Sequence, residues 1–178
     1  MTVKTTPWTG MFPANYGLVT VARVGGRTII GNRAALWDAD ALRPYVPTVP
    51  DDGYYKIHGR KFAPTDASGM PTGQALYDAL AKAEGRDDTP VRITEWGYRG
   101  DRVIITPAGQ IRTVPEAVAD LAIGLVDLRS TADPDGALAV YRYIGDDLRL
   151  VGMLQGYSRY KDDPVMAAIA ARSDYYSA

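Results

Sequence analysis

Hydrophobic and polar residues alternate in three segments of the chain that are each interrupted by glycine. The segments are 18–31, 90–106 and 137–154, and their turns lie at Gly25-Gly26, Arg99-Gly100-Asp101 and Gly145-Asp146-Asp147. Period-two alternation on both sides of a short turn rich in Gly and Asp is typical of a β-hairpin. The pattern therefore predicts three hairpins, and the segment GYYKIHGRKFAP at 53–64 predicts one further strand.

Helical spacing is clearest at 70–85, where Leu76, Ala79, Leu80 and Ala83 form one apolar stripe and Gly85 can end the helix in a left-handed cap. The segment 33–46 fits either a short helix or a strand followed by one. The segment 114–128 places apolar residues at helical spacing after a proline, and the tail predicts a C-terminal helix over 164–176.

Helices thus alternate with antiparallel pairs, which disfavours a doubly wound parallel sheet. We expect an α+β fold in which paired hairpins form antiparallel sheets and short helices pack on one face. The chain of 178 residues suits a single domain, 1–178. The proline-rich segment 44–53 is typical of a linker, which allows two lobes, 1–46 and 54–160.

The composition limits which kinds of site and partner this chain can have. The net charge is −1, there is no cysteine, and 46% of the residues are hydrophobic. These values indicate a globular chain without disulfides or an overall field for nucleic acid. The N-terminus lacks the apolar core of a signal peptide, and no apolar run is long enough to span a membrane. We expect a cytoplasmic protein with no membrane partner. Arginine far outnumbers lysine, which is typical of a GC-rich genome such as that of an actinobacterium or its phage.

Catalytic and metal sites are hard to assemble from these residues. His58 is the only histidine, and no serine lies in a GxSxG elbow. The acidic doublets fall in predicted turns, where Asp bonds nearby backbone amides, and no glycine pattern matches a phosphate-binding loop. We therefore expect a protein that is not an enzyme and has no metal or cofactor. An enzyme that uses carboxylates alone stays open as a minor alternative.

Basic and aromatic residues are interleaved at 54–62, a pattern that can stack bases and neutralise phosphates. The candidate DNA contacts are Lys56, Arg60 and Lys61 here, with Lys82 and Arg86 at the end of the predicted helix. The alternative is a solvated face that alternates with core aromatics. Cations at a helix C-terminus also oppose the helix dipole without any ligand.

The order of three segments resembles bacterial sliding clamps, the processivity factors of DNA polymerases. TGQALYDALAKAEGRDDTPVRITEWGYRGDRVIIT looks like the clamp unit of helix, strand, turn and strand. VTVARVGGRTIIGNRAALWDAD looks like a clamp hairpin, and ALAVYRYIGDDLRLVGMLQGYSR resembles the closing hairpin beside the partner-peptide groove. The resemblance implies two β-α-β-β-β units, a homo-oligomeric ring, and a partner-binding edge at Met153, Leu154 and Tyr157.

Two departures stand beside this resemblance. The helices lack the excess of Lys and Arg that sliding on DNA requires, and Met153-Leu154-Gln155-Gly156-Tyr157 replaces the usual ending of the closing hairpin. The sequence thus predicts a non-catalytic, clamp-like binding protein, encoded by a phage, that associates with replication proteins or weakly with DNA. The alternative is a small cytosolic interaction module or an inhibitor of a host protein, without a DNA role. Its contact patch would consist of exposed aromatic residues: Trp8, Tyr54, Tyr55, Tyr175 and Tyr176.

Overall fold

The computed structural model describes residues 17–43, 46, 48–58, 61–66, 69–84, 89–98, 100–107, 109, 111–116, 118–119, 126–130, 138–154 and 168. The first elements along the chain are five strands and then the helix: β1 (Leu18–Val24), β2 (Arg27–Gly31), β3 (Ala35–Asp38), β4 (Gly53–His58), β5 (Lys61–Pro64) and α1 (Gly73–Ala83). Seven strands follow: β6 (Thr89–Pro90), β7 (Arg92–Tyr98), β8 (Asp101–Ile105), β9 (Ile111–Pro115), β10 (Val126–Ser130), β11 (Leu138–Ile144) and β12 (Asp147–Leu154).

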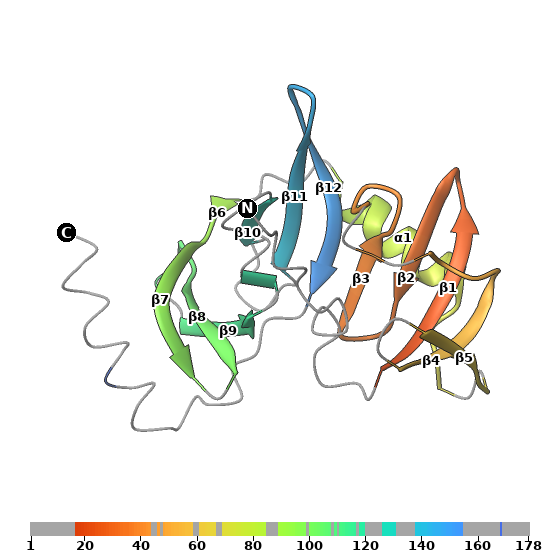
Figure 1. Cartoon of the computed structure of the whole chain (residues 1–178). Helices are drawn as coiled ribbons and strands as arrows, with labels where there is room; N and C mark the ends of the chain where they lie inside the picture. The colour runs from red at the N-terminus through yellow and green to blue at the C-terminus, as the bar shows by residue number, and fades with distance from the viewer. Residues whose placement is uncertain are drawn as a thin grey trace, which may run out of the picture.

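Two antiparallel sheets organise these strands. The larger has nine strands in the order β5-β4-β1-β2-β3-β12-β11-β10-β6, and the smaller has the order β7-β8-β9 (Figure 1). The expected α+β class with antiparallel sheets is confirmed. β1 pairs with β4, so strands from both sides of the 44–53 segment share the larger sheet.

The three predicted hairpins are present as β1–β2, β7–β8 and β11–β12. Glycine explains the first and the third turn. Gly25 and Gly26 have φ values of 58° and 78°, as a two-residue primed turn requires, and Gly145 has a φ of 65°. Residues other than Gly, Asn and Asp rarely adopt positive φ values. The turn of the β11–β12 hairpin projects beyond the neighbouring strands (Figure 1).

The helix α1 lies against one face of the larger sheet and contacts β1, β2 and β12. Thr72 caps its first turn by accepting a hydrogen bond from the Ala75 N–H at 3.1 Å. Leu76, Leu80 and Ala83 are buried as the apolar stripe predicts, whereas Ala79 is exposed. The helix ends at Ala83, and the expected cap at Gly85 lies outside the described residues.

Alternation along the strands divides the buried side chains into two clusters. One lies between the sheet and α1: Ile29, Leu36, Leu76, Leu80, Ala83, Ala139 and Leu150. The larger cluster holds Ala35 and Trp37 from β3 and also contains Ile104 and Val114 from the smaller sheet. Leu36 therefore faces α1 while its two neighbours face the other way. This alternation is the period-two geometry of a strand.

The structure contradicts one of the helix expectations and shifts the ends of another. Residues 33–46 contain the strand β3 and then turns, with no helix in their described part. The helix expected over 114–128 is present at Glu116, Val118 and Ala119, and its two ends differ from the expectation, because β9 extends to Pro115 and β10 begins at Val126. Strand pairing overrides the local helical spacing at 35–38 and at the two ends of the segment 114–128. Of the tail helix over 164–176, the structure describes residue 168 alone, so that helix stays a prediction.

Candidate functional site

An apolar groove of about 320 Å³ lies between α1, β3 and the end of β12. Its lining consists mainly of aliphatic side chains and one loop: Asn32, Arg33, Ala34, Ala35, Leu36, Pro71, Ala75, Leu76, Ala79, Met153 and Leu154. The volume is within the range of roughly 300–1,000 Å³ that is usual for ligand pockets. We call this site the apolar groove.

Small side chains on the helix leave the groove open. Ala75 and Ala79 are exposed, and they lie one helical turn apart beside the buried Leu76. Leu36 is only 6% exposed and Met153 is half-buried, so the sheet supplies an apolar floor. A larger residue at either alanine would fill the space, and burial of apolar area is the main gain that such a groove offers a ligand.

The loop at the mouth of the groove is held by a buried asparagine. The Asn32 side-chain oxygen accepts hydrogen bonds from the Ala34 N–H at 2.8 Å and the Ala35 N–H at 3.0 Å. Its amide nitrogen donates to the Leu18 carbonyl at 3.1 Å. Arg33, in the middle of this loop, is exposed and has no ion pair or hydrogen bond within the described part of the chain. The groove therefore combines an apolar floor with one uncompensated cation at its rim.

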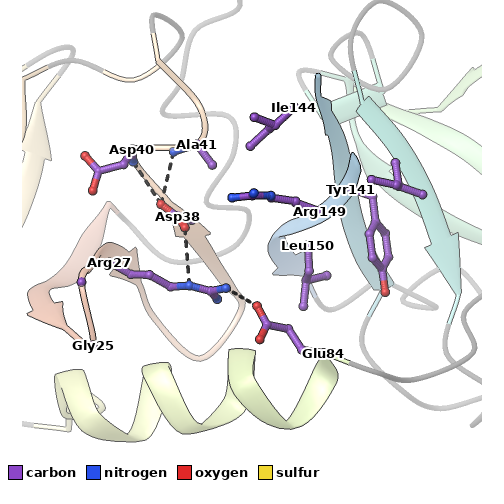
Figure 2. Close-up of a pocket in the computed structure, with 12 residues that line it drawn as sticks. Gly25, Arg27, Asp38, Asp40, Ala41, Glu84, Tyr141, Ile144, Arg149 and Leu150 are labelled. Atoms are coloured by element: carbon purple, nitrogen blue, oxygen red, sulfur yellow. Dashed lines mark hydrogen bonds and ion pairs between the residues drawn. The ribbon is translucent and has the colours of Figure 1, made fainter. Parts of the chain in front are cut away.

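A second cavity, of about 740 Å³, lies between the β2–β3 side of the sheet and the β11–β12 hairpin (Figure 2). We call it the charged cleft. Its lining is: Gly25, Gly26, Arg27, Asp38, Asp40, Ala41, Glu84, Tyr141, Ile144, Leu148, Arg149 and Leu150. Carboxylates and arginines occupy its rim, and Tyr141 and the leucines line one wall.

Arg27 bridges two carboxylates on the helix side of the charged cleft. It forms an ion pair with Glu84 at the end of α1, and its Nε lies 3.9 Å from an Asp38 oxygen (Figure 2). Asp38 also accepts hydrogen bonds from the Asp40 N–H at 3.1 Å and the Ala41 N–H at 3.2 Å. Burial raises the pKa of the Asp38 carboxyl, although these hydrogen bonds and Arg27 act to lower it.

The opposite wall of the charged cleft carries a cation without a partner. Arg149 extends toward the Asp38 side, and no described residue forms an ion pair or hydrogen bond with its side chain (Figure 2). Asp40 is already paired with Arg43 at 2.8 Å. Arg142 donates hydrogen bonds to the Ala41 and Arg43 carbonyls at 2.6 and 3.2 Å, which ties the β11 strand to the loop after β3.

The candidate DNA contacts are only partly brought together. Lys56 and Lys61 are exposed on the β4–β5 hairpin, where His58 is opposite Lys61 and therefore shares a face with both lysines. Lys82 is exposed in the last turn of α1, where it complements the helix dipole. Arg60 and Arg86 lie outside the described residues.

Two of the three candidate partner contacts, Met153 and Leu154, line the apolar groove, and Tyr157 lies outside the described residues. Sequence reasoning missed Arg33, Leu36 and Arg149. Arg33 follows the pair Gly31-Asn32 at the end of β2, and such a pair is a weak sequence signal of a loop. The other two carry no local signal, because their positions depend on strands more than a hundred residues apart meeting side by side.

Within the described residues, no group of three or more His, Cys, Asp or Glu side chains could hold a metal ion. The same residues include no helix long and apolar enough to cross a membrane. Searches against family models, curated proteins and solved structures found no match to this chain.

Proposed function

We propose that this chain is a non-catalytic binding protein whose apolar groove takes up a short peptide segment of a protein partner. The observation that carries the proposal is the groove itself. Met153 and Leu154 at the end of β12 meet the exposed alanine face of α1 around an open space of about 320 Å³. Aliphatic walls with few polar groups favour an apolar side chain over a metabolite that needs several fixed hydrogen bonds.

The charge at the rim of the apolar groove indicates which further residue the bound peptide should contain. Arg33 is exposed beside the groove and has no ion-pair partner in the described part of the chain. A guanidinium binds a carboxylate with two parallel hydrogen bonds. The preferred occupant is therefore a segment with two aliphatic side chains in the groove and an acidic residue, or a C-terminal carboxylate, next to Arg33.

Replication proteins are the partner class that the resemblance to sliding clamps implies, and we include them in the proposal. Weak contact with DNA through Lys56 and Lys61 belongs to the same proposal, because the two lysines share one exposed face of the β4–β5 hairpin. The alternative is an interaction module with the same groove and no DNA role. The two differ in one measurable property, affinity for duplex DNA at low salt.

The groove is tested by selecting phage-displayed random dodecapeptides on the immobilised protein and measuring the enriched peptides by fluorescence anisotropy. We expect aliphatic pairs next to Asp or Glu. Ala79→Glu should reduce affinity at least about tenfold, since it fills the groove and repels the acidic residue. Ala81→Glu is the matched control, because Ala81 is exposed on the same helix and does not line the groove. Equal affinity for both variants would remove the groove from the proposal.

The DNA and ring components are tested separately. A labelled duplex should bind in 20–50 mM salt, on the order of the low-salt range in which phosphate contacts dominate. The variant Lys56→Glu/Lys61→Glu should then lose that binding. Light scattering after size exclusion measures the oligomer, and a monomer at high micromolar concentration excludes a ring. Peptide binding without DNA binding selects the interaction module.

A further inference from the structure

The larger sheet is split beside the charged cleft. β3 pairs with β12 at Ala35, Leu36 and Trp37, which are opposite Leu154, Met153 and Gly152. The pairing ends there, because the Asp38 side chain accepts hydrogen bonds from the backbone N–H groups two and three residues further on and turns the chain away from β12. The part of β12 before Gly152 therefore continues along β11 with its other edge facing the charged cleft (Figure 2).

The geometry of the hairpin shows which backbone groups face this opening. Gly145 and Asp146 form a two-residue turn, and Ile144 is opposite Asp147. In such a hairpin the residues that flank the turn exchange hydrogen bonds, and every second pair does so. Arg149 therefore bonds to Arg142, whereas the N–H and C=O groups of Leu148 and Leu150 point away from β11. Within the described residues, no backbone group pairs with them on the cleft side.

Side chains alternate along the same stretch. The Leu148 and Leu150 side chains share one face with Tyr141, while Arg149 lies on the other face, and all four line the cleft. The carboxylates across the cleft already have cationic partners: Asp38 and Glu84 pair with Arg27, and Asp40 pairs with Arg43. The Arg149 side chain has no partner among the described residues. Arg149 is therefore the arginine of the cleft lining that makes no direct contact with a carboxylate, and it lies between two apolar positions along a free strand edge.

We propose that the charged cleft is a strand-addition site, which binds an extended peptide of the pattern apolar–acidic–apolar along Leu148, Arg149 and Leu150. The peptide backbone would bond to the free groups of Leu148 and Leu150. Its acidic side chain would lie opposite Arg149, and its apolar side chains opposite the two leucines, because paired residues of neighbouring strands share a face. Strand addition to an open sheet edge is a common mode of peptide recognition.

A second copy of this chain is a poor occupant of the same edge. Two antiparallel β12 edges paired about Arg149 would place two arginines opposite each other, and like charges in that position are destabilising. The site is also separate from the apolar groove, with which it shares no lining residue. Occupancy of one site can therefore be tested without the other.

The experiment selects phage-displayed random heptapeptides on the immobilised full-length protein, and measures the enriched peptides by fluorescence anisotropy. We expect the apolar–acidic–apolar pattern. Arg149→Glu should weaken binding at least about tenfold, and exchanging the acidic peptide residue for Lys should restore it. Leu148→Pro should weaken binding about tenfold, since proline removes the cleft-facing N–H; Leu148→Ala loses the leucine side chain but keeps that N–H, so it should bind the peptide more tightly than Leu148→Pro. Ala79→Glu, in the apolar groove, should have no effect.

Amide hydrogen exchange measured by NMR gives a second readout. The bound peptide should slow exchange at Leu148 and Leu150, and leave the β11-bonded amide of Arg149 unchanged. The proposal is overturned if no peptide of this pattern is enriched, if Arg149→Glu and Leu148→Pro bind the peptide as the unaltered protein does, or if protection appears only at the apolar groove. A peptide-free dimer whose formation protects the same two amides would assign the edge to a second copy instead.

Discussion

The first turn of α1 contacts β1 so closely that one methyl group should decide how the helix is seated. A Cβ built on Gly73 would lie 2.2 Å from the Ala22 Cβ. Carbon atoms in contact are about 3.5–4.0 Å apart, so Gly73→Ala must push the helix away from the sheet. The helix buries Leu76, Leu80 and Ala83 against the sheet, and all three contacts would loosen.

The magnitude follows from two opposing effects. Overpacking a filled interior costs about 1–3 kcal/mol, while replacing glycine restricts the unfolded chain and returns about 0.4–1 kcal/mol. We expect Gly73→Ala to lower the free energy of unfolding by about 1–2 kcal/mol. In the double variant with Ala22→Gly, the next atoms are the Ala22 Cα at 3.7 Å and a Val24 methyl at 3.8 Å, so the clash is gone. The two changes should therefore couple favourably by about 1–2 kcal/mol.

Urea denaturation followed by tryptophan fluorescence, to which the buried Trp37 contributes, measures these free energies. The control is Gly97→Ala in β7. The nearest atom to its added Cβ is the Asp101 carbonyl oxygen at 3.7 Å, so this substitution creates no clash. We expect this control to leave the free energy of unfolding unchanged or to raise it by up to about 1 kcal/mol. If Gly73→Ala unfolds at the wild-type urea concentration, or if the double variant shows simple additivity, the close helix–sheet contact is refuted.

Three further changes test other parts of the structure. Gly152→Ala places a Cβ 2.3 Å from the buried Trp37 ring and should cost about 1–3 kcal/mol in urea denaturation; an unchanged midpoint would contradict the packing. Thr72→Ala removes the helix cap and should cost about 1 kcal/mol, whereas Thr72→Ser, which keeps the hydroxyl, should retain most of the stability. Because burial raises the pKa of Asp38 above its ordinary value of 3.8, its protonation stabilises the folded state at low pH, and this contribution is lost as pH rises through the raised pKa. Asp38→Asn should remove that loss, so the free energy of unfolding relative to wild type should increase as the pH rises from about 4 to 7; a constant difference would show that Asp38 has an ordinary pKa.

Much of the secondary structure could be predicted because it depends on neighbours in the chain. Glycine at Gly25-Gly26 permits the turn angles, and period-two alternation on both sides identifies the first hairpin. The stripe of Leu76, Leu80 and Ala83 identifies the helix in the same way. The helix expected over 114–128 is present at Glu116, Val118 and Ala119, but its start lies after Pro115, since β8 pairs with the residues up to Pro115 and strand pairing outweighs local spacing there.

The binding surfaces could be predicted only in part. Met153 and Leu154 were expected at a partner contact, and both line the apolar groove, although that contact stays a prediction. Nothing near Arg149 in the sequence indicates a cleft. The cleft exists because β3 turns away from β12 after Trp37, and the two strands are separated by most of the chain.

The sequence by itself determined the local elements, namely where the strands alternate, where glycine permits a turn and where an apolar stripe makes a helix, because these depend on contacts between near neighbours. The tertiary structure alone decided which strand edges meet. The pairing of Gly152 with Trp37 joins the two halves of the larger sheet and places α1, β3 and β12 around one groove. Such a register depends on how distant side chains pack together, here the Trp37 ring over a residue without a side chain, and no local pattern contains that information.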